Sequence, residues 1–315
     1  MKPVDIKNLS ERSLQDSMAE VMSPHVIDVA DHEDALVEEM SCDRVATGIK
    51  LPWGKTHSLV RLREGEYSVF CGPSGHFKST LSFQICLWAM VEVKIGILSM
   101  EMRRSDVQMI FSQQAAGNIN PSEEFRRRLM RWQRGRMLFF DYFGMIDPIR
   151  ALGVMRYMLG KGCKLVVVDS MMLCKVTDDL DAEKAFVAEI ARLSEEFKAH
   201  IMVVHHTRKL SNERGGDLGT PTRSDVRGSG AITDLASSLF IVWNDKQKAA
   251  LLRKRDEYDF PLTDRETEYV NSRPCQKLIV CKQRHSPFEG AISLFKHPSR
   301  QFLATNRKEA IPFEF

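Results

Sequence analysis

The chain has 315 residues, 43% of them hydrophobic, and a formal net charge of only +3 at pH 7, which allows one large core or two small domains and excludes a general nucleic-acid coat but not a local basic surface. The 7 cysteines are scattered and no pair has CxxC spacing, which argues against a zinc site or a disulfide framework and is typical of a reducing cytosol. No apolar run is long enough to cross a membrane, so we expect a cytoplasmic protein without membrane contact.

The first 46 residues differ from the rest, because they are polar and carry a cluster of acids between positions 28 and 39. Ser10, followed by Glu11, can begin a short helix. Two interpretations stay open for this segment, a loosely ordered tail and an acidic arm that docks on a neighbouring subunit. We therefore predict an N-terminal arm or linker at 1–46 and a single larger domain at 47–315.

From about residue 66, short β-rich apolar runs alternate with amphipathic stretches. The runs are YSVFCG (67–72), KIGILSM (94–100), MLFFDYF (137–143), KLVVVDS (164–170), HIMVVHH (200–206), SLFIVWN (238–244) and KLIVCKQR (277–284). Strands that are apolar on both faces and separated by helical segments predict an α/β fold with a mostly parallel, twisted central sheet and helices on both faces. The clearest helix is expected at 181–200, where apolar residues recur at helical spacing.

Two segments break this alternation. Residues 208–230 are rich in glycine, serine and charge, and residues 245–274 are highly charged. Both should lie at the surface. A long glycine-rich loop inside a compact domain is either functional or disordered.

The segment CGPSGHFKST (71–80) follows an apolar run and precedes a helical pattern. This context makes a phosphate-binding loop of the form G-x-x-x-x-G-K-[ST] credible, although Phe77 stands where a glycine is expected. Backbone N–H groups of the loop point at phosphates, Lys78 pairs with the terminal phosphates, and Ser79 binds Mg²⁺. If position 77 requires a positive φ, phenylalanine costs roughly 1–2 kcal/mol, which is tolerable, so we expect Phe77→Gly to leave nucleotide binding intact.

Polar residues at the ends of three other runs complete the predicted site. Asp169 ends KLVVVDS, the pattern of a Walker B acid near Mg²⁺. Glu101 follows KIGILSM and can act as general base, or it is simply an acid at a helix start. His205 and His206 point to opposite faces of a strand, which argues against joint metal binding; one of them can contact the γ-phosphate, or both are partly buried polar residues.

We therefore predict ATP and Mg²⁺ as cofactors. The predicted cofactor-binding residues are Gly72, Pro73, Ser74, Gly75, His76, Phe77, Lys78, Ser79, Thr80 and Asp169, with Ser79 and Asp169 as the Mg²⁺ ligands.

The order of the motifs resembles the RecA-like motor domain of ring-forming replicative DNA helicases, the group of bacterial DnaB, phage primase-helicases and mitochondrial Twinkle. The motifs are CGPSGHFKST, LSMEM, VVVDS, VVHHTRK, SDVRGSGAI and VCKQR, and residues 48–70 resemble the lead-in of phage members. The resemblance covers roughly residues 47–303. It implies a RecA-like P-loop NTPase fold without a primase domain.

The resemblance also implies roles for single residues. Glu101 is then the catalytic base, Asp169 the Walker B acid and His206 the phosphate sensor. Lys282 and Arg284 are inserted into the neighbour's ATP site, with Arg284 as the arginine finger; from the residues alone, VCKQRH is an ordinary basic strand end. The implied catalytic residues are Lys78, Glu101, His206, Lys282 and Arg284.

The glycine-rich loop faces single-stranded DNA in this interpretation. Its basic residues provide phosphate contacts that weaken as salt rises, and the alternative is simple solvation of the loop. The implied DNA-binding residues are Lys209, Arg214, Arg223, Arg227, Gly228, Ser229 and Gly230.

The implied function is an ATP-dependent replicative helicase of the 5′–3′ type that forms a hexameric homo-oligomeric ring in a bacterial or phage-infected cell. Its implied partners are single-stranded DNA and a primase, polymerase or loader. Two departures from the family are Phe77 and the lack of a DnaB-type helical N-terminal domain. Two other functions stay open, an ATP-switched DNA-binding scaffold or loader and a recombinase without unwinding activity.

Overall fold

The computed structural model describes residues 32–41, 47–176, 179–214, 216–307 and 309–315. The chain divides into two compact units, 1–44 and 45–315. In the first unit the structure describes α2 (Glu33–Ser41), whose apolar residues Leu36, Val37 and Met40 are exposed. The helix expected after Ser10 lies outside the described residues.

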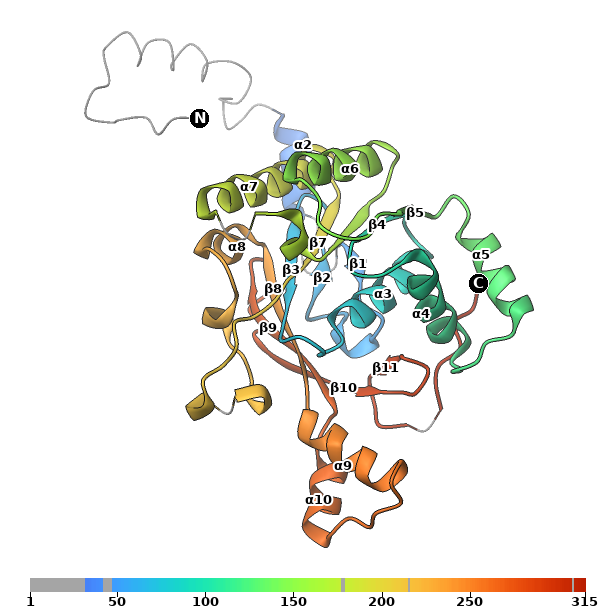
Figure 1. The fold of residues 1–315 in the computed structure, drawn as a ribbon. Coiled ribbons are helices and arrows are strands. Elements are labelled where there is room, and N and C mark those ends of the chain that lie inside the picture. The colour runs from blue at the N-terminus through green and yellow to red at the C-terminus, as the bar shows by residue number, and fades with distance from the viewer. Residues whose placement is uncertain (1–31, 42–46, 177–178, 215, 308) are drawn as a thin grey trace. The chain divides into compact units, whose positions relative to one another are not determined.

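A nine-stranded sheet forms the centre of the second unit (Figure 1), in the order β11-β10-β9-β8-β3-β7-β6-β4-β5. Its strands are β3 (Tyr67–Cys71), β4 (Ile95–Ser99), β5 (Met137–Phe140), β6 (Leu165–Asp169), β7 (His200–Val204), β8 (Ser238–Asn244), β9 (Gln276–Gln283), β10 (Gly290–Lys296) and β11 (Phe302–Leu303). Neighbouring strands from β5 to β8 are parallel, whereas β9, β10 and β11 pair antiparallel. The α/β fold and the mostly parallel sheet are thus confirmed, but the last expected strand runs antiparallel. A separate antiparallel pair is formed by β1 (Ile49–Lys50) and β2 (Arg61–Leu62).

Helices cover both faces of this sheet (Figure 1). They are α3 (Lys78–Ala89), α4 (Arg104–Ala116), α5 (Glu123–Gln133), α6 (Pro148–Gly160), α7 (Leu180–Glu196), α8 (Gly230–Leu235), α9 (Lys246–Asp256) and α10 (Asp264–Ser272). None of these helices in the described ranges is long and apolar enough to span a bilayer.

Alternate residues of each central strand enter two different cores. In β6, Leu165 and Val167 pack in the cluster that contains α3 and α4, while Val166 and Val168 pack in the cluster that contains α6 and α7. This alternation follows from the two-residue period of a strand. The runs that are apolar throughout in the sequence are therefore strands buried on both sides.

The register of the parallel strands brings four strand ends to one edge. Asp169 lies opposite Ser99 on one side and opposite Val204 on the other, and Val204 lies opposite Phe70. The residues that follow β3, β4 and β7 therefore emerge beside Asp169. This edge holds the candidate site.

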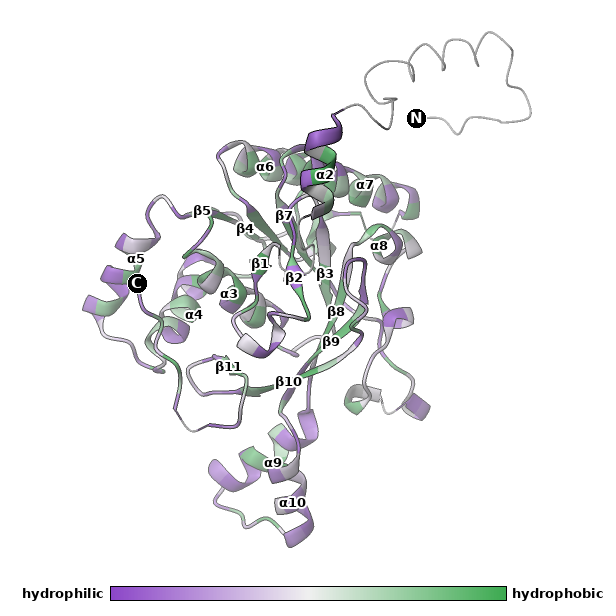
Figure 2. Ribbon diagram, turned by 180° about the vertical axis from the view of Figure 1, so that it is seen from behind, coloured by the Kyte–Doolittle hydropathy of each residue, from purple (hydrophilic) through white to green (hydrophobic). Residues whose placement is uncertain are grey.

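The charged stretch 245–274 folds into a helical hairpin of α9 and α10. Asp245 caps α9 by accepting a hydrogen bond from the Lys248 N–H, and Thr263 with Glu266 forms a capping box on α10. Both helices project away from the sheet, and Figure 2 shows hydrophilic residues along them. Charge alone placed this stretch at the surface, but the caps show why it is helical there.

Candidate functional site: a nucleotide pocket joined to a basic loop

The loop between β3 and α3 contains two residues in the left-handed region. Gly75 has a φ of 75°, and Phe77, directly before α3, has a φ of 63° and a ψ of 29°. Position 77 therefore does require a positive φ, at a cost of roughly 1–2 kcal/mol for a residue with a Cβ. No side chain caps α3, so its first N–H groups are available to an anion such as a phosphate.

The loop is fixed to the neighbouring strands at two points. The buried His76 ring accepts a hydrogen bond at Nδ1 from the Asn244 N–H (2.9 Å), and its carbonyl accepts one from Gln276 Nε2 (3.2 Å). A Cβ on Gly72 would lie 2.3 Å from the Val242 carbonyl oxygen, so only glycine fits there. The side chain of His76 thus anchors the loop in the core, and only its backbone can face a phosphate.

Lys78 is nearly buried and curls over the loop. Its Nζ donates to the carbonyls of Gly72 and Pro73, each at 3.0 Å, and lies 3.5 Å from His206 Nδ1. Burial lowers the pKa of Lys78, while the charges of Glu101 and Asp169 act in the opposite direction. The ammonium is held where the terminal phosphates of a nucleotide would lie.

Asp169 is fully buried at the end of β6. Burial and the nearby charge of Glu101 raise the pKa of Asp169 to about 7, while the Ser79 hydroxyl and Lys78 work to lower it. Among the described residues, no donor reaches either carboxylate oxygen in normal hydrogen-bond geometry, although this buried group needs compensation.

A Mg²⁺ ion fits this need. Among the described residues, no group of three or more His, Cys, Asp or Glu side chains could hold a metal by itself. Mg²⁺ commonly takes only one or two protein ligands together with substrate phosphates and water. Ser79 and Asp169 would hold it, and it would neutralise charge on the phosphates.

Glu101 lies just beyond the end of β4, beside Ser170 and His206. Ser170 Oγ donates to Glu101 Oε1 at 2.5 Å, and His206 Nε2 is 3.7 Å from the same oxygen. The interaction with His206 lowers the pKa of Glu101 most, Ser170 and Lys78 add to it, and burial opposes it. Glu101 is therefore an ionised carboxylate, the form that can accept a proton from water.

The two histidines after β7 point in different directions. His205 is buried, its Nε2 lies 2.8 Å from the Arg227 carbonyl oxygen, and burial lowers its pKa to about 4. His206 instead lies between Lys78 and Glu101. The residue predicted as phosphate sensor therefore faces the site, and its neighbour supports the basic loop.

One pocket of about 690 Å³ joins the nucleotide site to this loop. Its lining includes Pro73, Ser74, Glu101, His206, Lys209 and Arg227. The backbone continues the connection, since the Arg227 N–H donates to the His206 carbonyl (3.1 Å) and the Arg208 N–H to the Asp225 carbonyl (2.7 Å). The basic loop is thus attached directly to the residue that lies beside Lys78 and Glu101.

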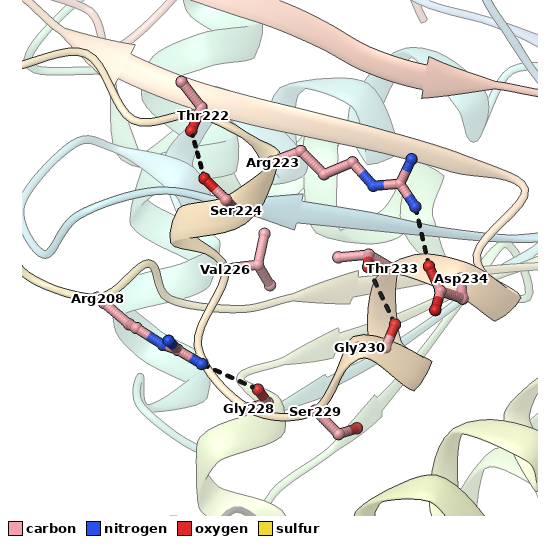
Figure 3. Close-up of a pocket in the computed structure, with 10 residues that line it drawn as sticks. All are labelled: Arg208, Thr222, Arg223, Ser224, Val226, Gly228, Ser229, Gly230, Thr233 and Asp234. Atoms are coloured by element: carbon pink, nitrogen blue, oxygen red, sulfur yellow. Dashed lines mark hydrogen bonds and ion pairs between the residues drawn. The ribbon is translucent and has the colours of Figure 1, made fainter.

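A second pocket of about 520 Å³ opens in the loop itself (Figure 3). Gly228 has a φ of 98°, and a Cβ there would lie 2.4 Å from Glu183 Oε2. The same buried Glu183 accepts a hydrogen bond from the Ser229 N–H. Gly228, Ser229 and Gly230 therefore present backbone rather than bulk to a ligand in this pocket.

The predicted DNA-binding cations fall into two groups. Arg214 makes a two-pronged ion pair with Asp225, at 2.6 and 2.8 Å, and Arg223 pairs with Asp234 at 2.9 Å (Figure 3). Lys209 and Arg227 are exposed, and the described part of the chain shows no carboxylate paired with either. We expect the second group to contact nucleic acid and the first to shape the loop.

Asp225→Asn should loosen the loop. The carboxylate binds Arg214 and also accepts from the Thr222 N–H and hydroxyl, and the Arg214 interaction is the main reason that its pKa falls to about 2. Because the Arg214 end is half exposed, we expect a loss of roughly 0.5–2 kcal/mol in loop stability. Limited trypsin digestion should cut the loop several-fold faster, with DNA-free ATP hydrolysis unchanged; an unaltered digestion rate would contradict this role.

Acidification tests the same contact. Because the folded pKa of Asp225 lies below its ordinary value of 3.8, its contribution is present above that pH and is lost as pH falls toward about 2.

Lys282 and Arg284 lie toward the other end of β8 from the phosphate loop. Lys282 is opposite Leu239 in the sheet register, and the Arg284 N–H donates to the Ser237 carbonyl. Gly72 lies against Val242, so along β8 the loop is roughly 10 Å from the level of Lys282 and roughly 16 Å from that of Arg284. Neither cation belongs to the nucleotide site of its own chain.

Both side chains bind the last carbonyls of α8. Lys282 Nζ donates to Thr233 (2.9 Å) and Asp234 (2.8 Å), and Arg284 contacts Asp234 and Leu235 at 3.4 and 3.3 Å. Cations are favourable at this end of a helix. Because α8 directly follows Ser229, the two cations are connected to the loop by one short helix.

Sequence reasoning missed Ser170, Arg208, Asp225 and Lys296. Ser170 could have been found, since it directly follows Asp169 at the same strand end. Arg208 lies in the basic loop and donates to the Gly228 carbonyl (3.3 Å). Asp225 and Lys296 carry no sequence signal, because sequence does not show which groups they contact.

Comparison with known proteins agrees with this site. Residues 59–212 match the profile of a family described as AAA domain, and no curated protein gave a sequence match. One solved structure, an isolated ATPase domain, is similar with a TM-score of 0.69 and 17% identity, over 88% of this chain and 99% of that one. A DnaB-like replicative helicase, studied for its interactions with primase, has a TM-score of 0.66 and 16% identity, over 92% and 71%. The RadB recombinase has a TM-score of 0.52 and 12% identity, over 81% and 98%.

These similarities define the class of protein. The chain carries a RecA-like AAA domain, a P-loop ATPase fold. Its fold is that of the ATPase domains of replicative helicases, so the resemblance predicted from the motif order is confirmed at the level of fold. At these identities the solved structures speak for the fold alone.

Proposed function

We propose that the protein is an ATP-dependent replicative DNA helicase, a motor that uses ATP hydrolysis to move along single-stranded DNA. The observation that carries the proposal is the pocket in which Glu101 and His206 share walls with Lys209 and Arg227. A nucleotide site and a strand-binding loop in one cavity allow the phosphate state to be felt directly by the loop.

His206 is the link between the two. Its side chain lies beside Lys78 and Glu101, while its carbonyl accepts from the Arg227 N–H. A shift of His206 on loss of the γ-phosphate would therefore move the backbone that carries Arg227. Such order changes at a phosphate-sensing loop are a known kind of switching transition.

The position of Lys282 and Arg284 supports a homo-oligomeric ring, hexameric by family resemblance. Both lie roughly 10–16 Å, along β8, from the level of their own phosphate loop, on the far side of β8 from β3. A head-to-tail interface could bring them to the next subunit's nucleotide, and such interfaces close into rings. The acidic segment 1–46 is proposed as an arm between subunits.

A primase, polymerase or loader partner is part of the proposal. The DnaB-like helicase of similar fold was studied for its interactions with primase. A partner of that kind would couple the movement of this motor along one strand to synthesis on the DNA that it separates.

The test is ATP hydrolysis with and without single-stranded DNA, together with displacement of a labelled strand from a fork. We expect stimulation by DNA that falls steeply as salt rises, because Lys209 and Arg227 release counterions from phosphates. Forks with a single 5′ or 3′ tail give the direction of movement, expected as 5′ to 3′. ATP binding without DNA-stimulated turnover would favour the scaffold or loader, and strand exchange without unwinding would favour a recombinase.

A further inference from the structure

Lys296 is a cation beside the phosphate loop that no motif predicts. Its Nζ lies 3.7 Å from the centroid of the Phe77 ring, and Phe77 directly precedes Lys78. The Lys296 N–H donates to Cys275 Sγ (2.8 Å), which fixes the end of β10 at this place. The ranges that the structure describes contain no carboxylate paired with Lys296, so its ammonium rests on an aromatic face instead of a counter-ion.

The strand order shows which end of a nucleotide Lys296 would meet. Glu101, Asp169 and His206 follow β4, β6 and β7, which lie on one side of β3, and β10 lies on the other side beyond β8 and β9. The γ-phosphate belongs beside the catalytic Glu101. The rest of the nucleotide then extends across the loop toward β10, so Lys296 lies on the nucleoside side.

We propose that Lys296 binds the α-phosphate of ATP and ADP, and that the Phe77 ring holds the same ammonium when no nucleotide is bound. This inference rests on the proposed function, since it requires a nucleotide at the loop. A cation–π contact and a phosphate compete for one lysine, and the phosphate prevails because a charge-assisted hydrogen bond is stronger.

Competition by Phe77 gives the unusual residue a purpose. A glycine at position 77 would leave Lys296 free for phosphate at all times, whereas the ring weakens binding of both ATP and ADP. Weaker ADP binding shortens its residence, which matters where product release limits turnover. The structure therefore revises the expectation from sequence that position 77 is neutral for nucleotide binding.

The experiment is a double-mutant cycle read by equilibrium binding of ATP and ADP to the full chain without DNA. Lys296→Met should weaken both nucleotides about 10- to 100-fold. Phe77→Leu keeps a side chain without a branch at Cβ, and so a similar backbone cost, but removes the ring; it should strengthen both about two- to five-fold. The double variant should bind like Lys296→Met alone, because the ring acts only through Lys296.

Two controls separate this inference from the proposed function. Phe77→Tyr retains the ring and should bind like the wild type, with an unchanged thermal unfolding midpoint. His206→Leu should weaken ATP but not ADP, since it lies at the γ-phosphate end. Loss of strand displacement with the cycle intact would overturn the helicase function and leave the Lys296 inference standing.

Three results would overturn the inference. Unchanged ADP affinity in Lys296→Met removes the phosphate contact. Additive effects of the two substitutions, or weaker binding in Phe77→Leu, would mean that the ring acts on the nucleotide directly. A wild-type chain that binds neither nucleotide would overturn this inference and the proposed function together.

Discussion

Arg284→Ala should lower DNA-stimulated ATP hydrolysis by roughly 10³-fold or more, the usual effect of an arginine finger on phosphoryl transfer. The physical reason is charge, since the guanidinium would stabilise the negative charge that develops on the γ-phosphate of the neighbouring subunit. Binding of ATP should change little, because the side chain of Arg284 donates only to α8 carbonyls among the described residues of its own chain. Steady-state hydrolysis and nucleotide binding, measured side by side, check both statements.

A mixture of two inactive variants tests whether the finger acts between subunits. Glu101→Gln subunits keep the finger, and Arg284→Ala subunits keep the base. In randomly mixed rings, about a quarter of the interfaces would pair an intact base with an intact finger, since each interface is head-to-tail. Arg255→Ala is the matched control, because Arg255 is an exposed arginine that pairs with its neighbour Asp256 at the surface.

Failure of this mixture to regain activity, or full activity of Arg284→Ala alone, would remove the interface mechanism. The prediction is sharp because the geometry leaves no other route. Sheet register places Arg284 level with Ser237, whereas Gly72 lies level with Val242. A side chain cannot cover that separation within one chain.

The fold could be predicted from sequence because burial on both faces is visible in composition. Runs such as KLVVVDS have no polar face, and only a strand covered on both sides buries them fully. The pairing of β9 to β11 could not be predicted, since antiparallel edges depend on contacts between distant segments. The α9–α10 hairpin was also missed, because its charges indicate exposure and its caps decide the helices.

The candidate site divides in the same way. Strand ends in a parallel sheet meet at one edge, so a pattern of Glu101, Asp169 and His206 after apolar runs was enough to group them. The partners of Arg214 and Arg223 were not accessible, because sequence gives charge but not which carboxylate lies within hydrogen-bond distance. The contact between Lys296 and Phe77 is the clearest case, since β10 reaches the loop only through the order of the whole sheet.

Glu101→Gln should reduce ATP hydrolysis by about 10²- to 10⁴-fold while leaving ATP binding intact. Gln retains the shape and still accepts the Ser170 hydroxyl, but it cannot take a proton from water. Rapid-quench hydrolysis and equilibrium ATP binding separate the two effects. Weak ATP binding in this variant would mean that Glu101 positions the nucleotide and is not the base.

The pH dependence of turnover identifies what tunes this base. His206 contributes most to the lowered pKa of Glu101, so the carboxylate stays ionised at pH values below its ordinary 4.5. His206→Leu keeps the bulk but removes the interaction, and burial then raises the pKa of Glu101. The acid limb of the rate profile should therefore move to higher pH in His206→Leu, so that its loss of activity is larger at about pH 5 than at about pH 8. An unshifted acid limb with reduced DNA stimulation would instead restrict His206 to signalling between phosphate and loop, and Ser170 and Lys78 would be left to hold the base ionised.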